Sequence, residues 1–263
     1  MQRKRFYYVI ELQYLGFRYH GWQKQKKTDL KTVEGMVQKT LKWILKDIRF
    51  KTLASGRTDA KVSANQTAFE LFVEEVPLEM DSFLIEFNEN LPSDINALTI
   101  REVDERFNII NNAKQKEYLY LFSFGEKNHP FAASLLVNIP YQLNIKLMQE
   151  ATKLFEGRHW FKNYCARPSP TAEFFREVTH CSIERNTLYT ANFFPEESYV
   201  LRVCGPGFMR YQIRLMAGTL FSLGRGDIDL EYIKDSLQED HIKEITWVAP
   251  SSGLILNSVK FDE

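Results

Sequence analysis

Three side chains of different chemistry follow one another at Arg57, Thr58 and Asp59, inside the stretch SGRTDAKVSANQ at residues 55–66. Gly, Ser, Asp and Asn are common turn formers, so the stretch is first of all a polar loop. A carboxylate so close to an arginine on a turn raises the question whether the pair also has a chemical role. The rest of the chain must decide between a plain turn and such a role.

A second group of candidates lies in the C-terminal half. Tyr118 stands on the aromatic stretch KEYLYLFSF, and Arg214 follows Arg210 by four residues, a spacing that places both on nearly the same face of a helix. Arg214 borders an apolar stripe, where an unpaired charge is costly, so it requires a partner. Asp59 is one candidate for that partner.

Several other chemistries have no motif in this chain. There is no GxGxxG after the first strand, no Walker A sequence and no GxSxG, and the five histidines lack HExxH spacing. GPGF before the arginine helix could hold a phosphate, although a tight turn is the simpler interpretation. Three cysteines, Cys165, Cys181 and Cys204, form no CxxC pair. We therefore expect no disulfide framework and no metal site, as in a reducing cytoplasm.

Composition predicts a globular chain. Of the 263 residues 44% are hydrophobic and 14% aromatic, and 34 basic residues balance 34 acidic ones. Any phosphate-binding surface must then be a local patch, and MQRKR at 1–5 and WQKQKK at 22–27 are candidates. We find neither a signal-peptide core nor an apolar run of membrane-spanning length. These features predict a cytoplasmic protein with no membrane segment.

Hydrophobic periodicity predicts an α+β protein. Strands are expected at 6–14, 69–73, 95–103, 116–124, 177–185, 197–204 and 254–261. Helices are expected from Thr32 to Ile48, from an N-cap at Asp81, from an N-cap at Asn144 to Gly157, from Met209 to Gly224, and briefly from Asp229.

Each half approximates the order β-α-β-β-α-β, which is typical of a ferredoxin-like sheet covered by helices on one face. We predict two such halves in pseudo-duplication with an active-site cleft between them. The N-terminal domain, 1–108, carries the aspartate loop, and the C-terminal domain, 109–263, carries the tyrosine strand and the arginine helix. The boundary falls in DERFNIINNAK at 104–114.

Five stretches, in this order, resemble the tRNA pseudouridine synthase A (TruA) family over nearly the whole chain. They are YLGFRYHGWQKQ at 14–25, GRTDAKVSANQ at 56–66, KEYLY at 116–120, GPGFMRYQIRLMAGTL at 205–220 and APSSGLILNSVKF at 249–261. The GRTDA loop and the QIR helix are fairly specific. The resemblance implies an isomerase that converts uridine to pseudouridine in tRNA, in the anticodon stem-loop at tRNA positions 38–40, without any cofactor or metal. It also implies a homodimer.

The same resemblance implies roles for individual residues. Asp59 would be the catalytic aspartate, acting either by covalent attack on the sugar or by removing a sugar proton to give a glycal. Arg214 would favour its ionised form, and Tyr118 would stack on the flipped uracil and take, or help to position the group that takes, the C5 proton. RNA contacts are expected from Arg57, Thr58, Lys61, Arg210, Arg18 and Lys24.

The chain departs from the family pattern at four positions. Lys61 replaces a common glycine, Ser63 a common histidine, Trp160 a common aspartate and Ile110 a common arginine. All four are expected near RNA, so another tRNA site or another RNA is an open alternative. A TruA-like RNA-binding protein without turnover is a second alternative. An RNA-recognition module of the stacking type is a third, although KEYLYLFSF lacks its signature.

Overall fold

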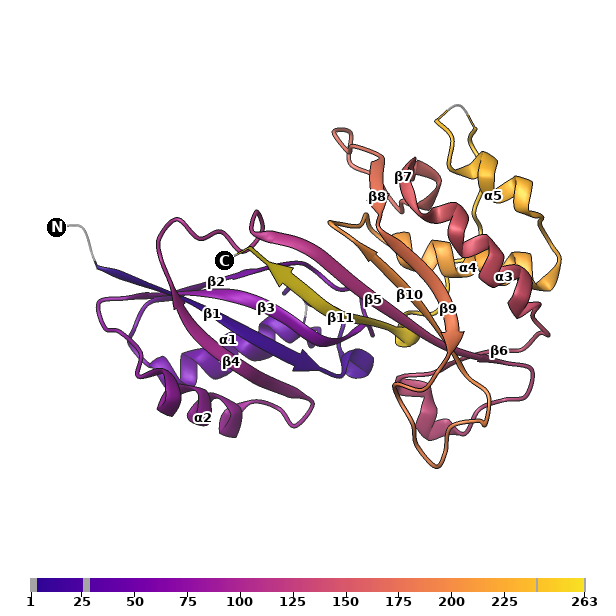
Figure 1. The fold of residues 1–263 in the computed structure, drawn as a ribbon. Coiled ribbons are helices and arrows are strands. Elements are labelled where there is room, and N and C mark those ends of the chain that lie inside the picture. The colour runs from indigo at the N-terminus through magenta and orange to yellow at the C-terminus, as the bar shows by residue number, and fades with distance from the viewer. Residues whose placement is uncertain (1–3, 26–28, 240, 263) are drawn as a thin grey trace. The chain divides into compact units, whose positions relative to one another are not determined.

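A computed structural model describes residues 4–25, 29–239 and 241–262, so the basic stretches at 1–5 and 22–27 lie partly outside the described residues (Figure 1). The chain forms two compact units, Met1–Lys114 with Leu256–Glu263, and Gln115–Ile255. The last strand thus ends in the first unit. Since compact units record packing and not independent folding, the division into domains 1–108 and 109–263 stays a prediction.

The first unit is a sheet of five strands with two helices. Its elements are β1 (Arg5–Tyr14), the 3-10 turn η1 (Gly16–Arg18), α1 (Val33–Leu45), β2 (Phe50–Ala54), β3 (Ser63–Glu74), α2 (Met80–Asn90), β4 (Ile95–Val103) and most of β11 (Leu254–Phe261). The strands follow the order β4-β1-β3, and both β2 and β11 pair with β3. β1 runs antiparallel to β3 and β4, and its register shifts between Leu12 and Tyr14 against β3 and between Glu11 and Leu12 against β4. Such irregularities bend a strand and redirect the residues that follow.

Local sequence explains the first helix. The hydroxyl of Thr32 accepts a hydrogen bond from the Gly35 N–H at 3.2 Å, which satisfies one of the free donors at the start of α1. Val37 and Leu41, one turn apart, are buried against the sheet. The predicted cap of the second helix was wrong: α2 begins after Glu79, and Asp81 lies in its first turn.

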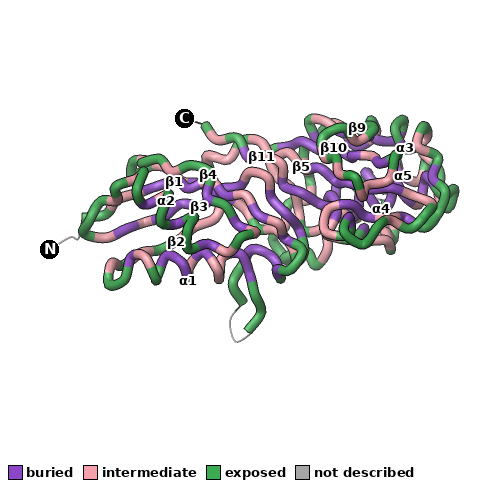
Figure 2. Tube along the Cα trace, turned by 90° about the horizontal axis from the view of Figure 1, so that it is seen from below, coloured by how far each residue is buried: buried purple, intermediate pink, exposed green. Residues whose placement is uncertain are grey.

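The core of the first unit lies between sheet and helices, and it is drawn in purple along the strands in Figure 2. A second, smaller cluster forms from Val9, Ala68 and Ile109, with Phe107 and Phe261 packed against them. Each fully buried aliphatic or aromatic side chain contributes about 1.5–3 kcal/mol by leaving water. Phe261 ties the end of the chain to the first unit.

The second unit is built around the antiparallel order β5-β10-β9, with β6 parallel to β5 and a separate pair β7-β8. Its elements are β5 (Ala113–Phe124), η2 (Pro130–Ser134), β6 (Val137–Ile139), α3 (Ile145–Thr152), η3 (Lys153–Phe155), β7 (Gly157–Trp160), η4 (Lys162–Tyr164), β8 (Phe175–Val178), β9 (His180–Arg185), β10 (Tyr199–Gly205), α4 (Gln212–Arg225), α5 (Leu230–Ser236) and η5 (Ser251–Gly253).

These elements confirm the α+β class and the order strand-helix-strand-strand-helix-strand in each half, with β6, β7 and β8 inserted into the second. The cap at Asn144 is confirmed, since its carboxamide oxygen accepts the Leu147 N–H. The short helix expected from Asp229 begins after that residue, whose carboxylate accepts the Tyr232 N–H. The helix expected from Met209 begins instead at Gln212, because Tyr211 has a φ of +66° and interrupts the helical backbone. Within the described ranges, no helix is long and apolar enough to span a membrane.

Candidate active site

The loop around Asp59 joins β2 to β3 and closes with a tight turn. The Val62 N–H donates to the Asp59 carbonyl at 3.2 Å, and Lys61, the third residue of that turn, has a φ of +66°. This left-handed conformation favours glycine and disfavours a side chain with a Cβ. Asp59 is half-buried and interacts with at least one other residue, whereas Ala60 and Lys61 are exposed.

The chain that leaves β1 supports this loop from behind. The hydroxyls of Tyr14 and Thr58 are hydrogen-bonded at 2.8 Å, and the Trp22 N–H donates to the Thr58 carbonyl at 3.1 Å. On the other side of Asp59, the Lys61 N–H donates to the Tyr19 carbonyl at 3.0 Å. The backbone on both sides of Asp59 is therefore fixed by residues some forty positions earlier.

Two glycines let these segments approach each other. A Cβ on Gly16 would lie 1.9 Å from the Val62 carbonyl oxygen, and a Cβ on Gly21 would lie 2.7 Å from that of Thr58. Gly21 also has a φ of +89°, where side chains are strained. The Gly16 N–H, in turn, donates to the hydroxyl of Ser63 at 2.9 Å. The glycines of YLGFRYHGW are thus required by close backbone contact.

The cations expected to contact RNA from the first unit differ in their surroundings. Arg57 is exposed, and its guanidinium has no hydrogen-bond or ion-pair partner among the described residues. Lys61 is exposed, with its ammonium 5.7 Å from the Phe17 ring centroid, and Lys24 is exposed too. Arg18 forms an ion pair with Asp94, so a phosphate would have to compete with that carboxylate.

In the second unit, Tyr118 lies half-buried on β5, opposite Val203 of β10. Its ring meets the Phe208 ring edge-to-face, with centroids 5.4 Å apart. Phe208 belongs to the GPGF turn, and Gly205 at the start of that turn pairs with Lys116 two residues before Tyr118. Burial lowers the pKa of Lys116, a half-buried cation on the same face of the strand as Tyr118.

Arg214 lies in the first turn of α4 and is held by the segment that precedes β11. Its Nε donates to the Ala249 carbonyl at 2.7 Å, and the Ala249 N–H donates to the Arg214 carbonyl at 3.1 Å. The guanidinium also lies 4.6 Å from the ring centroid of Tyr211, and that of Arg210 lies 5.2 Å from the same ring. The expectation that one helical face carries both arginines was wrong, since Arg210 precedes α4. Both guanidinium groups nevertheless lie near the ring of Tyr211.

Close packing of α4 against this segment depends on Gly218. A Cβ there would lie 1.8 Å from the Trp247 carbonyl oxygen. Three residues after Trp247, the Pro250 carbonyl accepts a hydrogen bond from the Tyr120 hydroxyl at 2.8 Å, and burial raises the pKa of that phenol. Gly218 and the residues from Trp247 to Pro250 therefore set the position of Arg214.

Two of the four departures have structural explanations. Ser63 is buried and bonded to Gly16, which excludes the expected RNA contact. Trp160 packs its ring against Phe174 and Phe175, with centroids 5.0 and 5.2 Å away. Lys61 and Ile110 are exposed, as a contact residue must be.

The structure groups six of the predicted site residues in the first unit and three in the second. The first unit holds Asp59, Arg57, Thr58, Lys61, Arg18 and Lys24, and the second holds Tyr118, Arg210 and Arg214. Sequence reasoning missed Tyr211 and Phe208, and no local signal predicts a left-handed tyrosine. Across the described ranges, no group of three or more His, Cys, Asp or Glu side chains is arranged to hold a metal ion.

Comparisons with known proteins identify the family of this chain. The profile of a family described as tRNA pseudouridine synthase matches residues 151–262, which include Arg214 and the Ala249 segment. A chain from the crystal structure of a Cbf5-Nop10-Gar1 complex aligns over 98% of this chain and 58% of its own at 14% identity, but its TM-score of 0.29 is too low to carry an argument.

Full-length relatives are more specific. The tRNA pseudouridine synthase A 2 of Bacillus cereus is 32% identical, with 97% of this chain and 99% of the relative covered. The tRNA pseudouridine synthase A of Pseudothermotoga lettingae is 32% identical, with 98% of this chain and 100% of the relative covered. That of Listeria monocytogenes is 30% identical, with 97% of this chain and 99% of the relative covered. The chain belongs to the tRNA pseudouridine synthase A family, a family of isomerases.

Proposed function

We propose that this chain isomerises uridine to pseudouridine in tRNA, within the anticodon stem-loop, with Asp59 as the catalytic residue. The observation that carries the proposal is the Asp59 loop: a half-buried carboxylate on a backbone fixed on both sides by Thr58 and Lys61, in a chain similar over its whole length to proteins named tRNA pseudouridine synthase A. A fixed backbone holds a reacting group in place before the substrate arrives.

The reaction conserves atoms, so it needs neither an oxidant nor an energy source. The C1′–N1 bond breaks, the uracil rotates, the C1′–C5 bond forms, and the proton on C5 is lost while N1 gains one. Asp59 starts the sequence either by attacking C1′ or by removing a sugar proton, and both routes require the carboxylate to be ionised. Arg214 favours that ionised form in the proposal.

The second unit supplies the remaining groups in this proposal. Tyr118 stacks on the flipped uracil and takes, or positions the group that takes, the C5 proton. Its phenol ordinarily has a pKa near ~10, so the positioning role is the less demanding of the two. The edge-to-face contact with Phe208 supports a fixed orientation of the Tyr118 ring.

RNA contacts in the proposal come from exposed cations. Arg57 occupies the gap left by the flipped nucleotide, and Arg210, Lys61, Lys24 and Arg18 contact phosphates without reading sequence. The hydroxyl of Thr58 is hydrogen-bonded to that of Tyr14, so in this proposal Thr58 shapes the loop backbone more than it contacts RNA. We further propose a cytoplasmic homodimer, as the family resemblance implies.

The test measures release of the C5 hydrogen from tRNA transcribed with tritium at C5 of uridine. Asp59→Asn should lower turnover by at least about a thousandfold while tRNA binding persists, since a positioned acid, base or nucleophile contributes factors of that order. Asp81→Asn is the matched control, because Asp81 is exposed and lies on α2 of the same unit.

Three outcomes separate the hypotheses. Turnover by wild type and Asp81→Asn but not by Asp59→Asn supports the proposal. Comparable turnover by Asp59→Asn refutes the catalytic assignment. Tight tRNA binding by the wild type without any release of tritium favours the alternative of a binding protein without turnover. Carbodiimide mapping of RNA from a strain that lacks the gene then identifies the modified uridine.

A further inference from the structure

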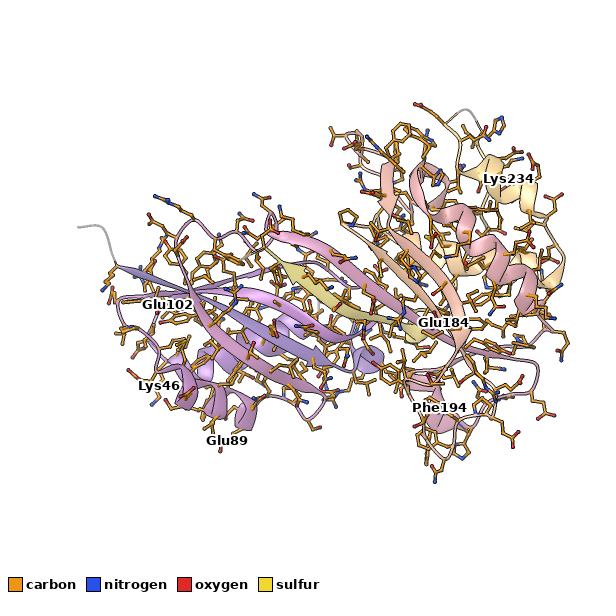
Figure 3. All side chains as sticks on the ribbon, viewed as in Figure 1. Lys46, Glu89, Glu102, Glu184, Phe194 and Lys234 are labelled. Atoms are coloured by element: carbon orange, nitrogen blue, oxygen red, sulfur yellow. The ribbon has the colours of Figure 1, made fainter. Side chains whose placement is uncertain are left out.

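A basic hollow lies in the first unit at the C-terminal end of α1, away from the Asp59 loop. It has a volume of about 780 Å³ and is lined by Lys42, Lys46, Arg49 and Lys51, with Asp47 and Glu74 as the acidic members of the wall. The cations come from three successive elements, the helix, the connection after it, and β2. Figure 3 labels Lys46, which directly follows α1.

The balance of charge in this wall is positive. Four cations face two carboxylates, and Glu74 already forms an ion pair with Arg5 at 3.4 Å, outside the wall. Lys42, Lys46 and Arg49 are exposed, and within the described part of the chain their side chains have no hydrogen-bond or ion-pair partner. The chain as a whole has a formal net charge of zero, so this excess is local.

Helix stability explains only part of the cluster. Lysines near the C-terminal end of a helix interact favourably with its dipole, which accounts for Lys42 and Lys46. It does not account for Arg49 in the connection or Lys51 on the strand. Like charges gathered around one hollow repel each other unless an anion lies between them. The arrangement therefore suits an anionic ligand with several charges.

We propose that this basic hollow binds the phosphate backbone of the tRNA substrate at a distance from the modified nucleotide. The inference rests on the proposed function. The start of α1 adjoins the Asp59 loop, since the Val33 and Glu34 N–H groups donate to the Gly21 and Trp22 carbonyls, and Trp22 donates to Thr58. The 13 residues of α1 rise 1.5 Å each, so its other end lies about 20 Å away.

That distance fits a stretch of helical RNA. Phosphates on one strand advance along the axis by about 3.4 Å in duplex DNA and by less in an A-form RNA stem, so about 20 Å corresponds to at least about six base-pair steps. A stem that continues from the target nucleotide along α1 brings several phosphates over the hollow. These contacts add affinity without reading sequence. They hold the tRNA at two points of the same unit.

The experiment measures tRNA binding as a function of salt concentration for wild type and for the triple variant Lys42→Gln, Arg49→Gln, Lys51→Gln. Each lost phosphate contact should reduce the slope of log affinity against log salt by about 0.7–0.9, so we expect a reduction of about 2 to 3. The rate at saturating tRNA should not change, because none of the three residues contacts the reacting nucleotide. The charge-retaining triple Lys42→Arg, Arg49→Lys, Lys51→Arg should restore the wild-type slope.

The control removes the same charge elsewhere in the first unit, by Lys39→Gln, Arg106→Gln and Lys260→Gln. All three residues are exposed and outside the wall of the hollow. A wild-type slope in the Lys42, Arg49, Lys51 triple, or an equal reduction in the control, overturns the inference. So does selective displacement of tRNA from wild type by inorganic phosphate at matched ionic strength, because the hollow would then hold a small anion. If wild type neither binds nor modifies tRNA, it is the proposed function that fails.

Discussion

Replacement of Gly218 by alanine tests how the structure positions Arg214. Within an isolated helix this change is favourable by about 1 kcal/mol, because glycine has the higher conformational entropy when unfolded. In this protein the new Cβ would lie 1.8 Å from the Trp247 carbonyl oxygen. Ordinary contact begins near 3.4 Å, so helix and segment must separate by about 1.6 Å, the difference between the two distances.

The cost has two parts. Overpacking of a close contact costs about 1–3 kcal/mol, and here the neighbour is backbone and cannot rotate away. The same displacement stretches the 2.7 Å bond from Arg214 Nε to the Ala249 carbonyl, and a hydrogen bond to a charged group contributes about 1.5–3 kcal/mol. After the helical gain is subtracted, we expect a loss of about 1.5–5 kcal/mol. For a protein of this size that corresponds to a Tm lower by about 3–20 °C.

Thermal unfolding followed by circular dichroism measures this shift, with Gly224→Ala as the matched control. Gly224 is on the same helix, but its Cβ would meet the flexible end of Met148, with the sulfur 2.5 Å away. The Met148 side chain can change rotamer to make room. The Tm of the Gly224→Ala variant should therefore change by less than about 3 °C. If Arg214 acts as proposed, Gly218→Ala should also lower the rate at saturating tRNA by at least about tenfold below its Tm.

The reasoning is refuted if Gly218→Ala is as stable as wild type, because the helical gain would then exceed the effect of the contact. It is refuted equally if Gly224→Ala loses more stability than Gly218→Ala. A variant that loses stability but keeps the full rate would separate the two claims: the packing argument would hold, and the proposed role of Arg214 would not.

Three further predictions concern the support of the Asp59 loop. Lys61→Gly should raise the free energy of unfolding by about 1 kcal/mol in urea titrations, since a φ of +66° strains any residue with a Cβ; an unchanged midpoint would contradict this. Ser63→Ala should cost about 1–3 kcal/mol in the same assay, because the Gly16 N–H loses its buried acceptor; a loss below half a kcal/mol would show that water replaces the hydroxyl. Burial and the Asp94 carboxylate raise the pKa of Tyr19 from 10.0 to about 12. The stability linked to the neutral phenol is therefore complete below pH 10 and lost as the pH rises through 12, by at most about 2–3 kcal/mol. Tyr19→Phe should remove that part of the pH dependence, and an identical pH profile in the variant would contradict the assignment.

Much of the fold could be predicted because its signals are local. Strands at 95–103 and 254–261 were predicted to the residue, and the cap at Asn144 was correct. The helices expected from Thr32 and Asp229 begin directly after those residues, which cap them. A cap needs only one side chain within three residues of a backbone N–H, so sequence contains the whole interaction. The strands β6 and β7, with three and four residues, are too short to show a period.

The errors arise where distant chain segments decide the local backbone. Tyr211 adopts a left-handed conformation that its residue type disfavours, and this shifts the start of α4 past Arg210. Two cations within 5.2 Å of its ring favour that position by cation–π attraction. Neither effect can be read from spacing, because the helical period predicts faces only where the helix is continuous.

The candidate site illustrates the same distinction. The two glycines of the first motif, YLGFRYHGW, are required by close backbone contacts. The backbone at Gly16 and Gly21 approaches the carbonyls of Val62 and Thr58, and a Cβ at either glycine would block that approach. The Asp59 loop therefore depends on the shape of the chain behind it more than on its own residues. Lysine at position 61 and serine at position 63 are both compatible with that shape. Lys61 adopts it with backbone strain, and Ser63 adds one buried hydrogen bond. Changes at Gly16 should consequently harm catalysis more than changes at Lys61, although Lys61 is the closer of the two to Asp59 in sequence.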